Sequence, residues 1–204
     1  MSDAAFGAAI RETFAAAATP LDDRAAAAFV VWAALLERWN RKIKLTTVTD
    51  PRGVAERHLL DASLVAIDPV AGERIVDVGA GAGVPGLPLA ILRPDLHVTL
   101  VERIAKKVAF LRAAVDALQL ANATVERADL ADLGGRGFDR AVSRALMAPA
   151  EWLVAARPAV RAGGAVGVMV ARQAELPPGS IEQVRRVTLP SDGAQRVLAW
   201  YRLV

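Results

Sequence analysis

The sequence contains no cysteine and only two histidines among its 204 residues. Without cysteine, a disulfide, a thiolate metal site and a cysteine nucleophile are all excluded. The chain also lacks any run of the roughly 18 to 20 apolar residues that a membrane-spanning helix requires. Its first residues, MSDAAFGAAIRETF, contain an early acid and no apolar segment with a cleavage site, so we expect no signal peptide. These absences favour a soluble cytoplasmic protein that holds no metal ion.

Net charge is also low, because 25 lysines and arginines oppose 22 acids and leave a formal charge of +3. The cations are nevertheless clustered, and RWNRKIK at 38–44 is the first cluster. The second cluster lies within 102–112 and consists of Arg103, Lys106, Lys107 and Arg112. Such clusters suit contact with phosphate groups, and they equally suit a solvated helix face. Charge alone leaves both interpretations open.

The first 70 residues predict a helical cap in front of a second domain. One apolar helix face repeats at intervals of three and four residues and consists of Phe29, Trp32, Leu36 and Trp39. We expect Thr19 to cap the start of this helix. A second helix is expected over 54–67, after the polar break TTVTDPRG.

The periodicity changes in residues 71–204, which predict the main domain. Short β-branched or apolar runs predict strands at 74–79, 97–102, 124–129, 138–143 and 165–170. Helical stretches are expected at 86–92, 105–120 and 149–160. Strands that alternate with helices predict a parallel sheet covered on both faces. The last two runs, RRVTLP and RVLAWYRLV, have no helix between them and predict an antiparallel hairpin at the sheet edge.

The stretch RIVDVGAGAGVPG at 74–86 places four glycines directly after a predicted strand. Glycine permits positive φ and lets a ligand approach the backbone closely. Parallel sheets bind ligands beyond the carboxyl ends of their strands, where this loop lies. Glu102, at the end of the next strand, falls where a carboxylate accepts hydrogen bonds from both ribose hydroxyls of a nucleoside. The loop therefore predicts a nucleoside-containing cofactor.

Two cofactors fit this loop at the level of pattern. Residues 81–86 match the G-x-G-x-x-G pattern of dinucleotide-binding proteins, and 77–83 match the D-x-G-x-G-x-G pattern of adenosylmethionine-dependent methyltransferases. Pro85 removes an N–H donor that a pyrophosphate would need, whereas Asp77 suits an ammonium and a sulfonium. Asp129, after the third strand, could accept from an adenine amino group. The residues favour the methyl donor, and an NAD(P)-dependent oxidoreductase or a non-catalytic RNA-binding module remains the alternative.

The segment after the predicted fourth strand reads VSRALMAP. It lacks the Asn/Asp-Pro-Pro-aromatic motif that is typical of methyltransferases acting on exocyclic adenine nitrogens. Attack through C5 of a pyrimidine uses a cysteine, and the chain has none. Arg144 stands at this place and is the candidate for contacting either the cofactor or the acceptor.

Four stretches resemble one known family: DVGAGAGVPGLPLAILRPDLHVTLVERIAKKVAFL (77–111), ERWNRKIKLT (37–46), RHLLDAS (57–63) and VSRAL (142–146). They are similar to the bacterial 16S ribosomal RNA guanine-N7 methyltransferases, the glucose-inhibited division protein B family. The resemblance implies an α/β protein with the class I S-adenosylmethionine-dependent methyltransferase fold. It also implies methylation of N7 of one guanine, guanine 527, in the 16S RNA or the small ribosomal subunit. We expect the protein to act as a monomer.

By this resemblance and by the loop pattern, the predicted cofactor-binding residues are Asp77, Gly79, Gly81, Gly83, Val84, Glu102, Ala128, Asp129 and Arg144. Contacts to the RNA are predicted at Arg57, His58, Lys106 and Lys107. Arg144 is also the predicted catalytic residue. Guanine N7 has a lone pair and no proton at neutral pH, so its methylation needs no general base. An arginine that recognises this base should contact O6 alone and leave N7 free.

Two positions depart from the family pattern. Members usually have Asn-Leu-Thr where this chain has Lys44-Leu45-Thr46. Many members have Lys-Gly where this chain has Ala171-Arg172-Gln173. Lys44 adds a cation to the face expected to meet RNA, and neither departure changes the glycine loop.

Overall fold

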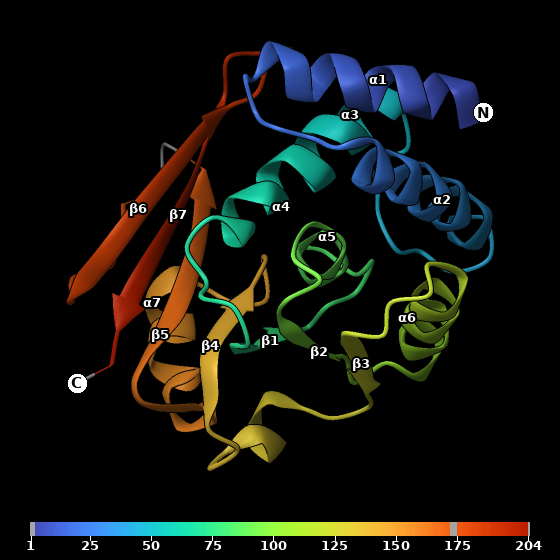
Figure 1. Ribbon diagram of the computed structural model, residues 1–204. Helices are drawn as coiled ribbons and strands as arrows, with labels where there is room; N and C mark the ends of the chain where they lie inside the picture. The colour runs from blue at the N-terminus through green and yellow to red at the C-terminus, as the bar shows by residue number, and fades with distance from the viewer. Residues whose placement is uncertain (1–2, 172–174, 204) are drawn as a thin grey trace.

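The fold is built on one seven-stranded sheet, shown in Figure 1. The structure, a computed structural model, describes residues 3–171 and 175–203. The strands are β1 (Arg74–Val78), β2 (His97–Val101), β3 (Ala123–Glu126), β4 (Phe138–Ser143), β5 (Val160–Ala171), β6 (Ile181–Thr188) and β7 (Gln195–Arg202). Their order across the sheet is β3-β2-β1-β4-β5-β7-β6. The order reverses between β1 and β4, which is where such sheets form a ligand-binding crevice.

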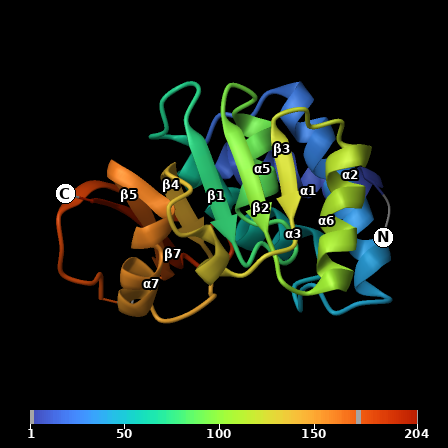
Figure 2. The same cartoon turned by 90° about the horizontal axis from the view of Figure 1, so that it is seen from below.

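Parallel pairing joins the first five strands, and the last two pair antiparallel. β1 lies between β2 and β4, with Val76 opposite Thr99 on one side and Ala141 on the other. Figure 2 shows β4, β1, β2 and β3 side by side. β7 pairs antiparallel with both β5 and β6, which confirms the predicted hairpin at the sheet edge.

The two faces of the sheet have separate hydrophobic cores, because successive side chains of a strand point to opposite faces. On β1, Ile75 belongs to a core that also contains residues of α5 (Gly86–Leu92), α6 (Ala105–Ala117) and the first two helices of the chain. Val76 packs instead with Trp152 of α7 (Pro149–Ala155). α7 ends earlier than the predicted 149–160, since Pro158 lacks the N–H that would continue the helix. The 3-10 turn η4 (Arg157–Ala159) follows, and then β5 begins.

The cap begins with two helices, α1 (Asp3–Ala16) and α2 (Asp23–Asn40). The predicted cap at Thr19 is wrong, because the carboxylate of Asp22 accepts from the backbone N of Ala25 at 2.6 Å. Asp22 directly precedes the first helical turn, whereas Thr19 donates to the carbonyl of Ala17. The predicted apolar face is otherwise present, with Trp32 fully buried. No helix among the described residues is long and apolar enough to cross a membrane.

The second predicted cap helix changes its type of turn along its length. It starts as α3 (Pro51–Val54), continues as the π-helical segment η1 (Ala55–Leu60), and ends as α4 (Asp61–Ser63) and the 3-10 turn η2 (Leu64–Ala66). Asp50 caps its start by accepting from the backbone N of Gly53 at 2.7 Å. Segments of π-helix are rare and occur frequently at functional sites. This one contains His58 of the predicted site.

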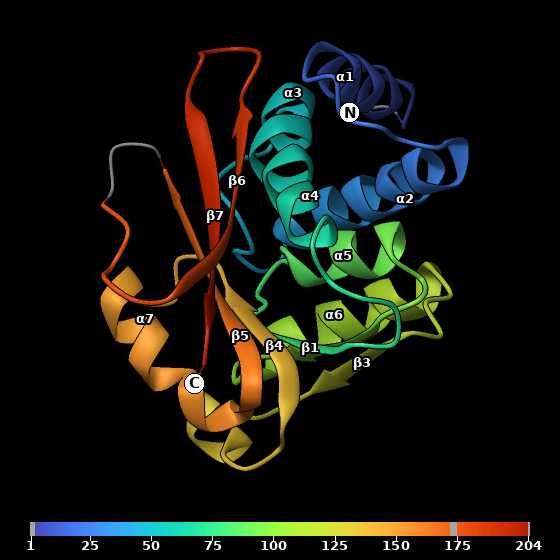
Figure 3. The ribbon, with the colours of Figure 1, turned by 60° about the vertical axis from the view of Figure 1, so that its left-hand side comes forward.

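The C-terminal hairpin lies against the cap, as Figure 3 shows for the turn between β6 and β7 beside α3. The hydroxyl of Ser191 in this turn donates to the carboxylate of Glu56, and Arg57 lies 3.7 Å from Asp192. The cap also shares one hydrophobic core with α5, α6 and the sheet. The expected boundary between residues 70 and 71 stays a prediction.

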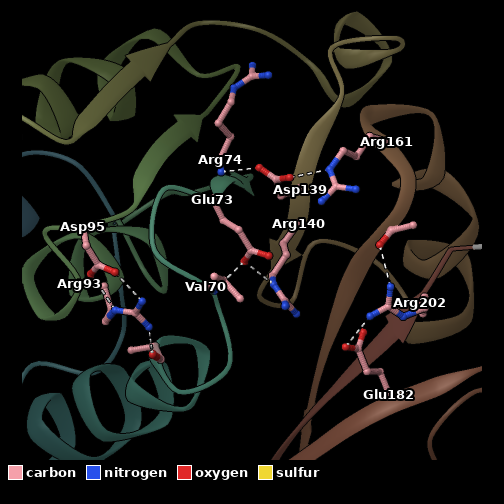
Figure 4. Close-up of polar contacts among 12 residues, drawn as sticks. Val70, Glu73, Arg74, Arg93, Asp95, Asp139, Arg140, Arg161, Glu182 and Arg202 are labelled. Carbon is pink, nitrogen blue, oxygen red and sulfur yellow. Dashed lines mark hydrogen bonds and ion pairs between the residues drawn. The ribbon is translucent and has the colours of Figure 1, made fainter.

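The amino ends of the strands form an edge held by paired charges, drawn in Figure 4. Asp139 accepts from the backbone N of Arg74 at 2.7 Å and from Arg161 at 2.6 Å. Arg140 donates to Glu73 at 2.8 Å and lies over the ring of Trp200 at 4.8 Å from its centroid. Arginine and carboxylate side chains at this edge therefore bind one another.

Candidate functional site

A cleft of about 850 Å³ lies at the opposite edge, beyond the carboxyl ends of β1, β2 and β4. Three walls contribute to it. The sheet loops contribute Gly79, Gly81, Val84, Glu102, Ala128 and Asp129; the segment after β4 contributes Arg144 to Met147; the cap contributes Leu45, Thr46 and His58. The cleft therefore gathers most of the predicted site residues at the point where the strand order reverses.

The glycine loop after β1 forms the floor of the cleft without side chains. Gly79, Gly81 and Gly83 have φ angles of 71°, 54° and 83°, values that favour glycine. A Cβ at Gly79 would lie 2.9 Å from Leu146, and one at Gly83 would lie 2.2 Å from Leu87. Gly83 thus supports the loop from below, while Gly79 and Gly81 face the cleft.

Glu102 holds this loop in place from the end of β2. It is 4% exposed, and its two oxygens accept from the backbone N of Gly81 at 3.1 Å and of Ile104 at 2.9 Å. A carboxylate has about four lone-pair sites, so two further acceptances remain for ribose hydroxyls. A fixed carboxylate beside a bare loop fits the nucleoside end of the expected cofactor.

Asp77 lies beneath the loop and not on the wall of the cleft. Its side chain is buried, and one oxygen accepts from the backbone N of Gly86 at 2.8 Å. Among the described residues the other oxygen has no hydrogen-bond partner. Burial raises the pKa of Asp77 to about 7, above the value of 3.8 usual for aspartate. The structure therefore places Asp77 as a support of the loop and of the start of α5.

The segment after β3 differs from its prediction. The strand ends at Glu126, not at Asp129, because Asp129 caps the 3-10 turn η3 (Leu130–Leu133). Its carboxylate accepts from the backbone N of Leu130 at 2.7 Å, and Asp132 accepts from the backbone N of Asp129 at 2.8 Å. Because of this capping box, β3 ends three residues before Asp129. Ala128 and Asp129 nevertheless both line the cleft as expected.

Arg144 fastens the end of β4 to the cap. Its guanidinium donates to the carbonyl of Arg57 at 2.5 Å and to Nδ1 of His58 at 3.0 Å, and it lies 3.6 Å from the carboxylate of Asp61. Arg57 and Asp61, which are close in sequence, do not pair. Asp61 binds Arg144, and Arg57 lies near Asp192 instead. Arg144 thus uses both terminal nitrogens of its guanidinium within the protein.

His58 is buried in this cluster and stays neutral. Burial lowers its pKa to about 3, and the neighbouring charge of Arg144 acts in the same direction. Its Nε2 lies 2.9 Å from the hydroxyl of Thr46. His58 is 5% exposed, so it presents little surface to an RNA chain.

Thr46 and Asn40 are functional candidates that sequence reasoning missed. Thr46 lines the cleft, and its hydroxyl also accepts from the backbone N of Val48 at 3.0 Å. Asn40, the last residue of α2, accepts from the backbone N of Leu45 and Thr46 and donates to the carbonyl of Thr46. The sequence signal for them is an asparagine at the end of a helix, followed within a few residues by a polar loop. Such a loop has neither helical nor strand periodicity, so a search for periodic patterns passes over it.

The predicted RNA contacts lie around the cleft in different settings. Lys107 lines the cleft, whereas Lys106 and Arg57 are exposed beside it. Neither lysine has an ion-pair partner within the described residues. Lys44 is exposed in the loop after α2. Of the second departure from the family pattern, Ala171 ends β5, while Arg172 and Gln173 lie outside the described residues. In the described ranges, no three acids or histidines gather as a metal site would require.

The fold and the cleft together define a class I methyltransferase. The structure is similar to a predicted O-methyltransferase from Agrobacterium tumefaciens, with a TM-score of 0.55, 26% identity, and coverage of 71% of this chain and 79% of that one. It also matches the fold of a SAM-dependent methyltransferase from Aquifex aeolicus at a TM-score of 0.53 and 15% identity, over 72% and 92% of the two chains.

Sequence comparison then gives the family. Residues 25–183 match the GidB family, described as rRNA small subunit methyltransferase G. The Ribosomal RNA small subunit methyltransferase G of Chromohalobacter salexigens is 46% identical over 171 residues, which cover 81% of this chain and 82% of that protein. The chain belongs to the rRNA small subunit methyltransferase G family. This confirms the expected family, fold class and cofactor, S-adenosylmethionine, and it decides against the oxidoreductase alternative.

Proposed function

We propose that this protein methylates N7 of guanine 527 of 16S ribosomal RNA, with S-adenosylmethionine as the methyl donor. The observation that carries the proposal is the chemistry of the cleft's inner wall, the surface formed by Thr46, His58, Glu102 and Arg144. Among the described residues there, His58 is neutral, with its Nδ1 engaged by Arg144 and its Nε2 by Thr46. Glu102 uses both oxygens on backbone N–H groups. Beside His58, the described residues therefore offer no free base, which suits an acceptor nitrogen that has no proton to lose.

The sheet loops would hold the cofactor. Glu102 would accept from the ribose hydroxyls, and Ala128 and Asp129 would contact the adenine. Gly79, Gly81 and Val84 would line the space for the rest of the cofactor. Gly83 and Asp77 support the loop from beneath. When bound, S-adenosylmethionine supplies an electrophilic methyl group on a sulfonium. The contribution of these residues is to fix the reacting atoms in line, which can account for a large part of a rate enhancement.

The cap and the segment after β4 would receive the RNA. A base must leave its stack to enter such a cleft. Leu146 and Met147, which are 42% and 36% exposed at the cleft, offer an apolar surface beside an unstacked base. Arg57, Lys106 and Lys107 would contact phosphates around the opening. We propose a positioning role for Arg144 and His58, which hold the inner wall in place, and a monomer bound to the small subunit or its RNA.

Methyl transfer to small subunits that lack the modification tests this proposal. Labelled S-adenosylmethionine is supplied, the RNA is digested, and the nucleosides are separated. Label in 7-methylguanosine is the expected result. Label in another nucleoside would keep the rRNA methyltransferase class and contradict the acceptor atom. An absence of label on both subunits and naked RNA, with donor binding demonstrated, would favour the non-catalytic RNA-binding alternative.

A further inference from the structure

We propose that Thr46 recognises the target guanine by donating a hydrogen bond from its hydroxyl to O6 of the base. The inference rests on the proposed function, because it concerns the same cleft and the same base. It follows from three features of the inner wall: the tautomer of His58, the free hydrogen of Thr46, and the engaged donors of Arg144.

The tautomer of His58 follows from its neighbours. A guanidinium can only donate, and NH2 of Arg144 lies 3.0 Å from Nδ1 of His58. Nδ1 must therefore accept and carry no hydrogen. The ring hydrogen of neutral His58 is then on Nε2, which donates to the hydroxyl of Thr46 at 2.9 Å. The carbonyl of Arg57, 3.2 Å from Nδ1, receives its hydrogen from NH1 of the same guanidinium.

This assignment fixes the direction in which Thr46 can donate. Its oxygen accepts from Nε2 of His58 and from the backbone N of Val48. A hydroxyl has two acceptor sites and one hydrogen, so both acceptor sites are filled and the hydrogen remains. Within the described residues this hydrogen has no acceptor, and Thr46 lines the cleft. The hydroxyl is therefore a donor that is left for a ligand.

The position of Thr46 relative to the cofactor wall identifies that ligand as the acceptor base. The ribose and adenine are assigned to Glu102 and Asp129, at the ends of β2 and β3. The glycine loop toward β1 and β4, beside the cap residues, would then hold the rest of the donor. A base that meets the methyl group there lies beside Thr46.

Guanine and adenine differ at the atom that Thr46 would contact. Guanine presents O6, an acceptor, whereas adenine presents an amino group, a donor, at the same place. A hydroxyl that can only donate pairs with guanine and opposes adenine. The guanidinium of Arg144, His58 and the hydroxyl of Thr46 form a series of connected hydrogen bonds, and such connected bonds strengthen one another. The contact leaves N7 free for methylation.

The test measures wild type and two Thr46 variants on small subunits that carry one of three bases at the target position. Small subunits are reconstituted with guanine, inosine or 2-aminopurine at the target position; inosine keeps O6, and 2-aminopurine lacks it. The enzymes are wild type, Thr46→Val and Thr46→Ser, and rates of methyl transfer are measured under limiting RNA. Thr47→Val, at an exposed neighbouring threonine, is the matched control for removal of a hydroxyl. Affinity for adenosylhomocysteine is measured for each protein.

We expect wild type to lose roughly tenfold in rate from guanine to 2-aminopurine, the worth of one good hydrogen bond. Thr46→Val should lose about as much on guanine and nothing further on 2-aminopurine, while Thr46→Ser and Thr47→Val should follow wild type. Inosine should behave as guanine throughout. Equal losses by Thr46→Val on guanine and 2-aminopurine would overturn the contact and leave Thr46 a structural residue. Wild type that ignores the missing O6 would overturn it without any variant, and wild type inactive on guanine would contradict the proposed function itself.

Discussion

The two edges of the parallel sheet use charge in opposite ways. At the amino edge, carboxylates meet arginines directly, as Glu73 meets Arg140 and Asp139 meets Arg161. At the carboxyl edge, Glu102 and Asp77 accept only from backbone N–H groups among the described residues. Paired charges satisfy each other and stabilise the fold. Of these two acids, Glu102 lines the cleft and keeps lone pairs for a ligand, which makes the carboxyl edge the functional one.

The largest effect should come from breaking a buried pair at the amino edge. Arg140→Met leaves the largely buried carboxylate of Glu73 without its partner and removes the guanidinium from Trp200. We expect the free energy of unfolding in urea to fall by about 3 kcal/mol, the cost of uncoupling a buried ion pair. Donor affinity should not change, because the residue lies far from the cleft.

Arg202→Met is the matched control for that variant. Arg202 pairs with Glu182 in a more exposed setting, with side chains 52% and 27% exposed. Such pairs contribute at most about 1 kcal/mol. If folded Arg140→Met bound the donor more weakly than wild type, the claim that the amino edge serves only stability would be contradicted.

The next largest effect should appear at the carboxyl edge, in ligand binding. Glu102→Ala removes the acceptor for ribose and releases Gly81 from its place. We expect donor affinity, measured by calorimetry, to weaken by about 1.5–3 kcal/mol, the worth of hydrogen bonds to a charged group. Glu126→Ala, at the end of β3 and paired with Arg136, is the control that should leave donor affinity intact. Equal affinities in wild type and Glu102→Ala would show that the ribose lies elsewhere.

Asp77 should give the carboxyl edge a distinct dependence of stability on pH. Its folded pKa of about 7 lies above the unfolded value of 3.8, so the folded state holds a proton that the unfolded chain has released. Its contribution is therefore complete below the unfolded pKa and is lost as pH rises toward 7. The slope approaches about 1.4 kcal/mol per pH unit. Asp77→Asn keeps an acceptor for Gly86 and should flatten the curve of unfolding free energy against pH; an unchanged slope would show that the carboxyl is not buried in its acid form.

The smallest effect concerns the lysines beside the cleft. Lys106→Ala and Lys107→Ala should each reduce the slope of log affinity for RNA against log salt by about 0.7 for each single-strand phosphate that the lysine neutralises. Stability should be unaffected, because neither lysine has an ion-pair partner in the described ranges. Arg186→Ala is the control, because Arg186 is an exposed cation on β6, the outermost strand at the side of the sheet away from β3. Slopes that match that control would make the lysines an ordinary solvated surface.

The carboxyl edge also shows how far sequence reasoning extends. The glycine loop and Glu102 were predictable because local pattern fixes them: glycines where φ must be positive, and an acid one strand later. The parallel sheet and its final hairpin were predictable from periodicity alone. These features depend on residues close together in the chain.

The inner wall was not predictable in the same way, because it joins segments far apart in the sequence. Arg144 lies 86 positions from His58, yet the two make one hydrogen bond. Asp61 pairs with Arg144 and not with Arg57, four positions away, because the end of β4 reaches the π-helical turn of the cap. The end of β3 was misplaced for a local reason, since a capping box at Asp129 outcompetes strand pairing. The predicted role of each site residue toward a ligand remains a prediction.

Mapping the methyl group on the RNA is the most direct test of the proposed acceptor. Small subunits lacking the modification are treated with enzyme and S-adenosylmethionine, and the RNA is cleaved chemically at 7-methylguanosine with borohydride and aniline. We expect one new cleavage position, at guanine 527, which is absent when the enzyme or the donor is omitted. Methylation without such cleavage, or cleavage spread over several guanines, would contradict it.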